Sequence, residues 1–426
     1  MLDIKFVRER PDAVRKDLEK RDNKEKIALL DSILDKDKEY RESLYKAQKL
    51  KHKRNVITSE INALKKEGRD ISEKISEAKE LPGRIKAIDE KIDALKNSIT
   101  NGLMRLPNIL HSSVPKGKDE NDNKTVRVWG KKPKFNFELK SHGELIESLG
   151  LADFDAAARV SGNGFYYLLG DIALLDLALQ RFAVDHLIKK GYMLVEPPLM
   201  LRRKPYEGVT DLNDFETMMY KIDKEDLYLI ATSEHPIGAR YMDGVFNEEE
   251  LPKKFVGISP CFRKEIGSHG IDTKGLFRVH QFSKVEQFIF CRPEDSWKLH
   301  EELIKNSEGL FKKLRLPYRV VDICTGDIGT VAAKKYDLEV FMPREKKYRE
   351  VVSCSNCTSY QAARLNIRYR KGDEKEYVHT LNSTAIATSR ALRAVIENCQ
   401  QKDGSIKVPL ALVPYMNGIT VIGKKK

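Results

Sequence analysis

The sequence predicts an α+β protein that begins with a long antiparallel helical hairpin. Residues 24–106 repeat apolar side chains in steps of three and four, as two packed helices do. A stretch rich in Pro, Gly, Asn and Lys follows, and beyond it helix-like and strand-like segments alternate. We therefore expect a helical arm over residues 1–106, a linker over 107–135 and a mixed domain over 136–426.

Composition narrows the classes of protein that fit this chain. No run of about 18 uncharged apolar residues occurs, so a membrane span is not expected. The opening MLDIKFVRERPD carries charges where a signal peptide needs an apolar stretch. Six scattered cysteines suggest reduced thiols in a cytoplasmic protein. The net charge of +13 favours a polyanionic partner, although a Lys-rich surface kept for solubility would give the same total.

The arm is predicted from its seam and its turn. In the second half the seam is regular, at Ile85, Ile88, Ile92, Leu95 and Ile99. A turn signal, KEGRD at residues 66–70, separates the two halves. Pro82-Gly83 is expected to bend the returning helix or break it into two pieces.

A basic block, KAQKLKHKR at residues 46–54, lies on the outgoing helix. Its charges have one sign, whereas exposed helices usually mix in Glu to form pairs four residues apart. The block is either a solvated coiled-coil surface or a reader of helical RNA. The candidate RNA-binding residues are Lys46, Lys49, Lys51, Lys53 and Arg54.

The mixed domain is predicted to contain a functional hairpin. In PCFRKE, residues 260–265, a strand would point Arg263 and Glu265 the same way. A second strand, residues 276–290, should expose one face and bury the other. The exposed face would hold Arg278, His280, Phe282, Lys284, Glu286 and Phe288, and the buried face Phe277, Val279, Val285 and Ile289. Residues 266–275, with three glycines, should form a mobile loop between them. A solvent-facing strand with cross-strand ion pairs is the alternative.

Other segments predict structural elements and no catalytic or binding residues. Residues 170–190 have a broad apolar stripe and should form a helix, followed by a short strand over 192–198 that ends in prolines. Cys354-x-x-Cys357 has metal-like spacing, but no second pair lies nearby. We expect no zinc, and we expect both thiols to pack in the core.

The hairpin resembles motif 2 of class II aminoacyl-tRNA synthetases, and the whole chain is similar to the seryl-tRNA synthetase family. The resemblance covers the basic arm, the helix–strand–proline of motif 1, FRKE with RVHQFSKVEQF, and NSTAIATSR at residues 382–390 as motif 3. Motif 3 lacks the usual glycines, as in archaeal members. The resemblance implies an antiparallel-sheet catalytic domain and a homodimer joined through motif 1.

The resemblance also assigns an ATP site. Arg263 and Arg390 would be catalytic, because a planar guanidinium can bind phosphate and carboxylate oxygens together. Arg390, if helical, would share a face with Ser383. Glu350 and Ser353 would hold Mg²⁺, unless Glu350 is a surface carboxylate paired with Arg349 or Lys347. The implied ATP-binding residues are Arg263, Lys264, Glu265, Val279, Phe282, Glu350, Val351, Val352, Ser353 and Arg390.

A serine pocket is implied in the same way. Its residues would be Thr232, Ser233, Glu234, Arg263, Glu286, Asn382, Ser383 and Thr384. Ser233 stands where the family usually has Ala, so its hydroxyl either enters the pocket or turns away. A pocket built to hydrogen-bond a hydroxyl rejects alanine, while rejecting threonine needs steric closure.

The resemblance implies a cytoplasmic ATP-dependent serine–tRNA ligase that acts on tRNA(Ser), with tRNA(Sec) left open as a second substrate. Two rivals stay open. One is a ligase of the same fold that charges a carrier protein, and the other is a non-catalytic RNA-binding coiled-coil protein with a degenerate synthetase domain.

Overall fold

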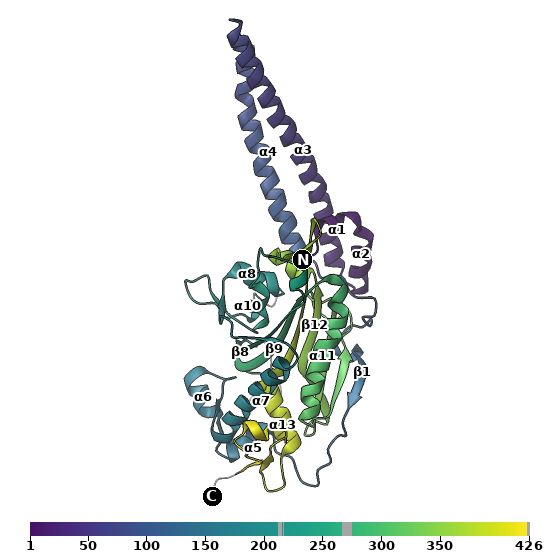
Figure 1. Cartoon of the computed structure of the whole chain (residues 1–426), viewed down its shortest axis with the longest axis vertical. Helices are drawn as coiled ribbons and strands as arrows, with labels where there is room; N and C mark the ends of the chain where they lie inside the picture. The colour runs from purple at the N-terminus through teal and green to yellow at the C-terminus, as the bar shows by residue number, and fades with distance from the viewer. Residues whose placement is uncertain (212–214, 216, 266–274, 424–426) are drawn as a thin grey trace. The chain divides into compact units, whose positions relative to one another are not determined.

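The computed structural model describes residues 1–211, 215, 217–265 and 275–423. Two compact units make up the chain, residues 1–107 and 108–426 (Figure 1). Each of the two holds its own packed interior, and each is described separately below.

The N-terminal unit is entirely helical. Its elements are α1 (Ile4–Glu9), α2 (Pro11–Lys20), α3 (Lys24–Lys66) and α4 (Ser72–Arg105). Helices α3 and α4 lie side by side along the arm (Figure 1). The seam predicted from the sequence is buried at Ile85, Ile92 and Ile99 of α4, and Leu30 and Ala47 of α3 are buried as well. The antiparallel helical hairpin is therefore confirmed.

Of the two outcomes expected at Pro82, a bend or a break of the returning helix, the break does not occur. Helix α4 runs without interruption from Ser72 to Arg105, with Pro82 inside it. A proline removes one N–H donor and costs roughly 3 kcal/mol in a helix interior. Burial of Leu81 and Ile85 beside it supplies stabilisation of that order, because most helical stability in proteins comes from packing of the apolar face.

The C-terminal unit is built on an eight-stranded sheet with the strand order β1-β10-β11-β12-β15-β9-β8-β4. Neighbouring strands are antiparallel except for β4 and β8, which run parallel. The strands are β1 (Lys124–Trp129), β4 (Met193–Val195), β8 (Lys253–Phe262), β9 (Gln281–Cys291), β10 (Tyr318–Asp322), β11 (Lys334–Met342), β12 (Lys347–Thr358) and β15 (His379–Ala387).

Three helices pack against this sheet: α7 (Gly170–Ile188), α11 (Ser296–Lys313) and α13 (Thr388–Cys399) (Figure 1). The largest apolar core lies between them and the strands. Val285 and Ile289 of β9 belong to this core, so alternate residues of β9 face away from these helices. The predicted helix over 170–190 and strand over 192–198 correspond to α7 and β4, and Cys354 is buried in the same core.

The smaller elements complete the unit. They are α5 (His142–Ser148), β2 (Ala152–Asp153), α6 (Phe154–Ser161), β3 (Tyr167–Leu168), β5 (Met200–Leu201), α8 (Arg203–Val209), β6 (Tyr228–Leu229), α10 (Glu234–Ala239), β7 (Val245–Phe246), α12 (Tyr360–Leu365), β13 (Arg368–Lys371), β14 (Glu374–Tyr377), β16 (Ile406–Lys407) and β17 (Val421–Ile422). A second core, rich in aromatic side chains such as Tyr206, Phe288 and Phe290, packs α8, α10 and α12.

The expected linker over residues 107–135 is only partly irregular. Residues 124–129 form β1, which pairs with β10 and becomes an edge of the sheet. The ring of Trp129 stacks 5.7 Å from that of Tyr318, and the side-chain amide of Asn108 donates to the carbonyl of Cys357 at 2.8 Å. Long-range packing thus recruits a segment whose flanking Pro, Gly and Lys residues indicated a loop.

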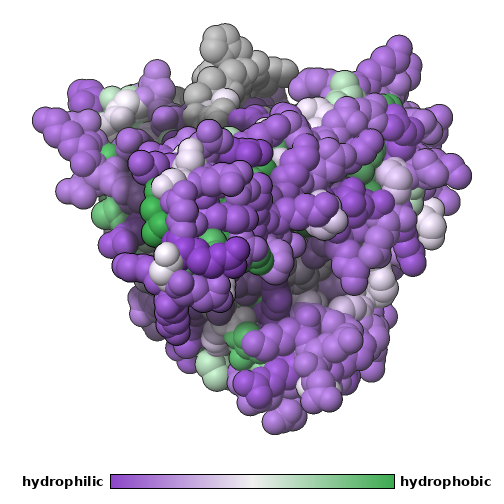
Figure 2. Space-filling view, turned by 90° about the horizontal axis from the view of Figure 1, so that it is seen from above, coloured by the Kyte–Doolittle hydropathy of each residue, from purple (hydrophilic) through white to green (hydrophobic). Residues whose placement is uncertain are grey.

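Hydrophilic side chains dominate the face that Figure 2 shows. In the part of the chain that the structure describes, no helix combines the length and apolar composition needed to cross a membrane.

Candidate active site

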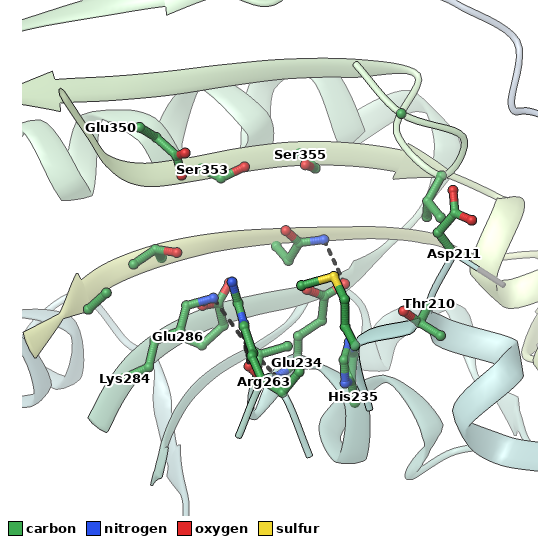
Figure 3. A pocket seen from close by; sticks show the side chains of 18 of the residues that line it. Thr210, Asp211, Glu234, His235, Arg263, Lys284, Glu286, Glu350, Ser353 and Ser355 are labelled. Carbon is green, nitrogen blue, oxygen red and sulfur yellow. Dashed lines mark hydrogen bonds and ion pairs between the residues drawn. The ribbon is translucent and has the colours of Figure 1, made fainter. Parts of the chain in front are cut away.

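A cavity of about 420 Å³ opens on the sheet face opposite the three large helices. Figure 3 shows side chains of β9 and β12, which lie on either side of β15 in the sheet, along the strands that line the cavity. Thirteen residues predicted from the sequence line it: Thr232, Glu234, Arg263, Glu265, Val279, Phe282, Glu286, Glu350, Val351, Ser353, Asn382, Thr384 and Arg390.

Arg263 lies just beyond the end of a strand. Strand β8 ends at Phe262, and Glu265 has a positive φ of 43°. The strand argument for placing Arg263 and Glu265 on one face is therefore wrong, although both line the cavity. The chain leaves the ladder here, and the turn re-aims both side chains.

Contacts with a backbone carbonyl and an aromatic ring hold the guanidinium of Arg263 in place. Its Nε and Nη2 each donate to the carbonyl of Ala231 at 3.4 Å, and its charge lies 5.3 Å from the ring of Phe282. Within residues 1–211, 215, 217–265 and 275–423, no carboxylate lies within ion-pair distance of it. An unneutralised guanidinium beside a cavity is suited to binding an anion.

Strand β9 forms one wall. It begins at Gln281, and from there the expected alternation holds: Phe282, Lys284 and Glu286 face the cavity. Before Gln281 the alternation fails, because those residues are not in a strand. Phe277 and Val279 therefore line the cavity instead of packing behind it, and Arg278 is exposed.

Phe288 and His280 were also assigned to the exposed face, and neither lines the cavity. Phe288 is fully buried in the aromatic core. His280 turns to the backbone: its Nδ1 lies 2.8 Å from the carbonyl oxygen of Arg263, and its ring stacks on Phe165.

The same wall concentrates buried charge. Nζ of Lys284 lies 2.5 Å from Glu286 and donates to the hydroxyl of Thr232 at 3.3 Å. Burial raises the pKa of Glu286, against the lowering effect of Lys284. Burial, together with the charge of Glu286, raises the pKa of Glu234 from 4.5 to about 7. Buried carboxyl groups with raised pKa values beside a cavity mark a candidate binding site.

Glu234 is also positioned by amides. One of its oxygens accepts from the side chains of Gln361 and Asn382, each at 3.0 Å. Burial lowers the pKa of the adjacent His235 to about 3, with Arg263 and Lys284 adding to the effect, so His235 stays neutral there at pH 7.

The part of the cavity lining that β12 supplies depends on a β-bulge in this strand. The ladder to β11 pairs Leu338 with Val352 and Glu339 with Glu350, which leaves Val351 as an extra residue. In a regular strand, Glu350 and Ser353 would point to opposite faces. The bulge places Glu350 and Ser353 on the same face of the sheet, the face that lines the cavity. Ser355, two residues further on, lies on that face as well (Figure 3).

Glu350 is fixed by a cation. Nη1 of Arg390 lies 2.9 Å from its carboxylate. Burial alone would raise the pKa of Glu350, but the charges of Arg390 and Lys335 outweigh it and lower that pKa from 4.5 to about 2. The alternative pairing with Arg349 is wrong, since Arg349 binds Glu345 at 2.5 Å.

Four residues assigned from the sequence do not line the cavity. Ser383 belongs to β15, not to a helix with Arg390, and its hydroxyl donates to the carbonyl of Thr384 on the far side of the strand. Ser233 is fully buried, beside Gly257 of β8. The backbone N–H of Lys264 donates to Met218. Val352 packs in the large core behind the cavity.

The cavity lining also includes residues that received no role from the sequence, among them Lys284, His235, Lys335, Ser355 and Ser389. Strand period could have found two of them, because Lys284 lies between Phe282 and Glu286 and Ser355 follows Ser353 at a step of two. Lys335 lies on β11, and only the strand register brings it to the site. The expected mobile loop at 266–275 falls, except for Gly275, outside the described residues.

In the N-terminal unit, the basic block divides into two sets. Lys46 and Lys49 border a groove between α3 and α4, together with Arg84 and Lys91. Lys51 and Lys53 instead pair across the hairpin with Asp89 and Glu77, at 2.9 and 2.5 Å. Arg54 donates to Asn55. The pairs of Lys51 and Lys53 link the two helices, and Lys91 is itself paired with Glu39. Among the described residues that border the groove, Lys46, Lys49 and Arg84 make no ion pair with the described part of the chain.

Comparisons with known proteins identify the family of the chain. Residues 216–399 match the tRNA synthetase class II core domain that serves G, H, P, S and T, so the C-terminal unit has the catalytic fold of a class II aminoacyl-tRNA synthetase. Residues 1–110 match the seryl-tRNA synthetase N-terminal domain. A serine–tRNA ligase of Methanocella arvoryzae is 59% identical over 98% of this chain and 99% of its own. The chain belongs to the seryl-tRNA synthetase family.

Solved structures give the same result. The crystal structure of seryl-tRNA synthetase from Pyrococcus horikoshii complexed with ATP covers 100% of both chains with a TM-score of 0.95 and 50% identity. A cytoplasmic serine–tRNA ligase from Naegleria fowleri in complex with AMP covers 100% of this chain and 99% of its own, with a TM-score of 0.89 and 37% identity.

Proposed function

We propose that this protein activates L-serine with ATP and transfers it to the 3′ end of tRNA(Ser). The first step joins the serine carboxylate to the α-phosphate and releases pyrophosphate, and the second moves the seryl group to the tRNA. The observation that carries this proposal is the guanidinium of Arg263, held beside a cavity of about 420 Å³ with no carboxylate partner among the described residues.

Arg263 would bring the two reacting anions together. Its planar donors can bind a phosphate oxygen and a carboxylate oxygen at once, which lowers the repulsion between nucleophile and phosphate. Arg390 would neutralise charge on the outer phosphates, and Phe282 and Glu265 would hold the adenine by stacking and by hydrogen bonding. Catalysis would then rest on positioning and electrostatics, with no covalent enzyme intermediate.

Glu350 and Ser353 fit a magnesium ion that arrives with the nucleotide. No set of three or more His, Cys, Asp and Glu side chains is arranged to hold a metal alone, as far as the described residues extend. Mg²⁺ commonly takes one or two carboxylates and completes its shell with phosphates and water. The carboxylate and hydroxyl that the bulge places on one wall suit that role, in which the ion offsets phosphate charge.

The serine pocket would use Glu286 and Glu234 for the ammonium and hydroxyl, with Thr232, Asn382 and Thr384 around them. These are buried polar groups, and a ligand that lacks a hydroxyl would leave some of them unpaired. Alanine would thus be rejected by lost hydrogen bonds.

The apolar exposed side chains of α7 and β4 support a homodimer. Leu177 and Met193 are 60% and 62% exposed, and β4 is an edge strand with one side unpaired in the sheet. Such an edge usually needs a cover. Free thiols at all six cysteines favour the cytoplasm as the compartment.

The decisive experiment is ATP–pyrophosphate exchange with serine, threonine, alanine and glycine, followed by charging of tRNA(Ser) and tRNA(Sec) transcripts. Exchange that depends on serine excludes the non-catalytic binder. Charging of tRNA excludes the carrier-protein ligase. Absence of serine-dependent exchange from folded protein with Mg²⁺ and ATP would overturn the proposal.

A further inference from the structure

A buried histidine, His142, binds the backbone at Leu276, just before the second strand of the hairpin. The backbone N–H of Leu276 donates to Nε2 of His142 at 2.9 Å. Nδ1 of the same ring lies 3.3 Å from Oε1 of Glu397. A ring nitrogen that accepts an N–H cannot itself carry a proton, so the proton sits on Nδ1 and points to Glu397. His142 is 1% exposed and Glu397 is fully buried.

Glu397 belongs to α13, the helix whose first turn bears Arg390. One turn before Glu397, Nε of Arg393 donates to the same carboxylate oxygen at 3.0 Å. Another nitrogen of Arg393 donates to Glu345. His142, at the start of α5, is therefore linked to α13 through a charged network inside the protein, where such bonds are strong and geometrically demanding.

Phe277, the next residue after Leu276, lies between two cations. Its ring centre is 5.3 Å from the guanidinium of Arg390 and 4.6 Å from that of Arg393. Phe277 and Arg390 both line the cavity, whereas Arg393 is 1% exposed. Cations over an aromatic face are attracted to it, and the attraction strengthens when water is excluded. The position of the Phe277 ring thus affects where the Arg390 guanidinium lies.

We propose that His142 is a positioning residue for the nucleotide half of the active site. It fixes the backbone of Leu276 against α13, keeps the Phe277 ring between the two arginines, and so holds Arg390 at the cavity. His142 touches no substrate itself. The approach is close, since a Cβ on Gly275 would lie 2.5 Å from Nε2 of His142. This inference rests on the proposed function, because it assigns Arg390 to ATP.

Two substitutions at His142 test its two hydrogen bonds, to Leu276 and to Glu397, separately. Asn at position 142 places an amide near Nδ1, and Gln reaches the position of Nε2. We expect His142→Asn, which loses the acceptor for Leu276, to raise the KM for ATP about tenfold, as loss of one buried hydrogen bond does. The KM for serine should stay within about twofold, and His142→Gln should recover most of the ATP effect.

The matched control is His300→Gln. His300 is also 1% exposed and also binds backbone, with Nε2 3.1 Å from the carbonyl oxygen of Cys354, but it lies on α11 and does not contact Leu276. We expect it to leave the ratio of the two KM values unchanged. If His142→Asn melts well below the wild type, Phe277→Leu tests the same link while it leaves the hydrogen bonds among His142, Glu397 and Arg393 in place, and it too should raise the KM for ATP selectively.

The dissociation constant for ATP, measured by calorimetry on the same variants, tests the role of His142 in ATP binding without an activity assay. Selective weakening of ATP binding in His142→Asn, with recovery in His142→Gln, supports it. Equal loss for serine and ATP, or unchanged ATP binding in folded His142→Asn and Phe277→Leu, overturns it. If the wild type binds ATP but shows no serine-dependent exchange, the proposed function fails while the ATP constants still judge the role of His142.

Discussion

Nη1 of Arg390 lies 2.9 Å from the carboxylate of Glu350, and the two side chains come from different elements, α13 and β12. The pair holds Glu350 ionised far below neutral pH, with a pKa of about 2. Protonation of Glu350 would therefore not limit metal binding at physiological pH. Arg390, which itself lines the cavity, fixes the carboxylate that we propose as a magnesium ligand.

Replacing Glu350 by Gln removes the charge but keeps the shape. We expect the Mg²⁺ concentration for half-maximal exchange to rise about tenfold or more, because a neutral amide binds a hard cation poorly. Titration of exchange with Mg²⁺ measures this. The matched control is Glu339→Gln on the adjacent strand, whose side chain binds Arg319. An unchanged Mg²⁺ requirement in Glu350→Gln would remove Glu350 from the metal site.

Arg263→Ala should lower serine-dependent exchange by about 10²–10³ or more, because it deletes a fixed cation at the reacting anions. Arg263→Lys should recover little, since an ammonium cannot form the forked pair of bonds. The control is Arg278→Ala, an exposed arginine of the same segment that lies outside the cavity lining. Exchange assays with melting curves measure both. Near-normal exchange in Arg263→Ala would refute its role.

Glu234 should make stability depend on pH in the direction opposite to a paired surface carboxylate. Its folded pKa of about 7 exceeds the ordinary 4.5, so the folded state binds the proton more tightly than the unfolded state. The resulting stabilisation is present below pH 4.5 and is lost as pH rises through 7. Relative to Glu234→Gln, the wild type should lose about 2–4 °C of melting temperature between pH 5 and 8. A constant difference would contradict the raised pKa.

On the arm, Lys46, Lys49 and Arg84 are expected to contact tRNA phosphates. Changing all three to Ala should weaken tRNA binding and lower the slope of log K against log salt by about one for each lost contact. Exchange, which needs no tRNA, should be unaffected. The control is Lys51→Ala with Lys53→Ala, which removes cations already paired with Asp89 and Glu77. Equal effects from both sets would show that general charge, not the groove, binds tRNA.

The dimer prediction concerns Leu177 and Met193. Substitution of both by Asp should yield monomers, because two charges would have to be buried in the contact. Sedimentation velocity measures the mass. Val128→Asp is the control, since Val128 is 64% exposed on β1 at the other edge of the sheet. A wild-type monomer at micromolar concentration would refute the dimer directly.

The fold could be predicted where local pattern and packing agree. The seam of Ile85, Ile92 and Ile99 predicted the arm because a heptad can be read from one helix alone. The proline argument alone overstated the effect of Pro82, because packing against α3 stabilises α4 and local sequence does not show that packing. Strand β1 could not be predicted for a similar reason. Its sequence lies among Pro, Gly and Lys residues, and its strand conformation depends on pairing with β10.

The site could be predicted in its residue types but not in their directions. Alternation located Phe282 and Glu286 on one face, yet it failed for Phe277 and Val279, which precede the strand. Ser383 was given the wrong direction because β15 continues to Ala387 and α13 starts only at Thr388. Lys335 could not be found, since its place depends on the register between β11 and β12. The family resemblance supplied the assignments that spacing alone could not.

The extra residue in β12 changes which face of the sheet the side chains after it point to. Deleting one valine from Val351-Val352 would remove the bulge and leave Glu350 and Ser353 two residues apart, so strict alternation would still place both on one face. Straightening the strand at its present length would instead turn either Glu350 or the serines that follow toward the apolar side. The pairing of two residues of β12 against one of β11, rather than the identity of the extra residue, therefore decides which side chains reach the cavity.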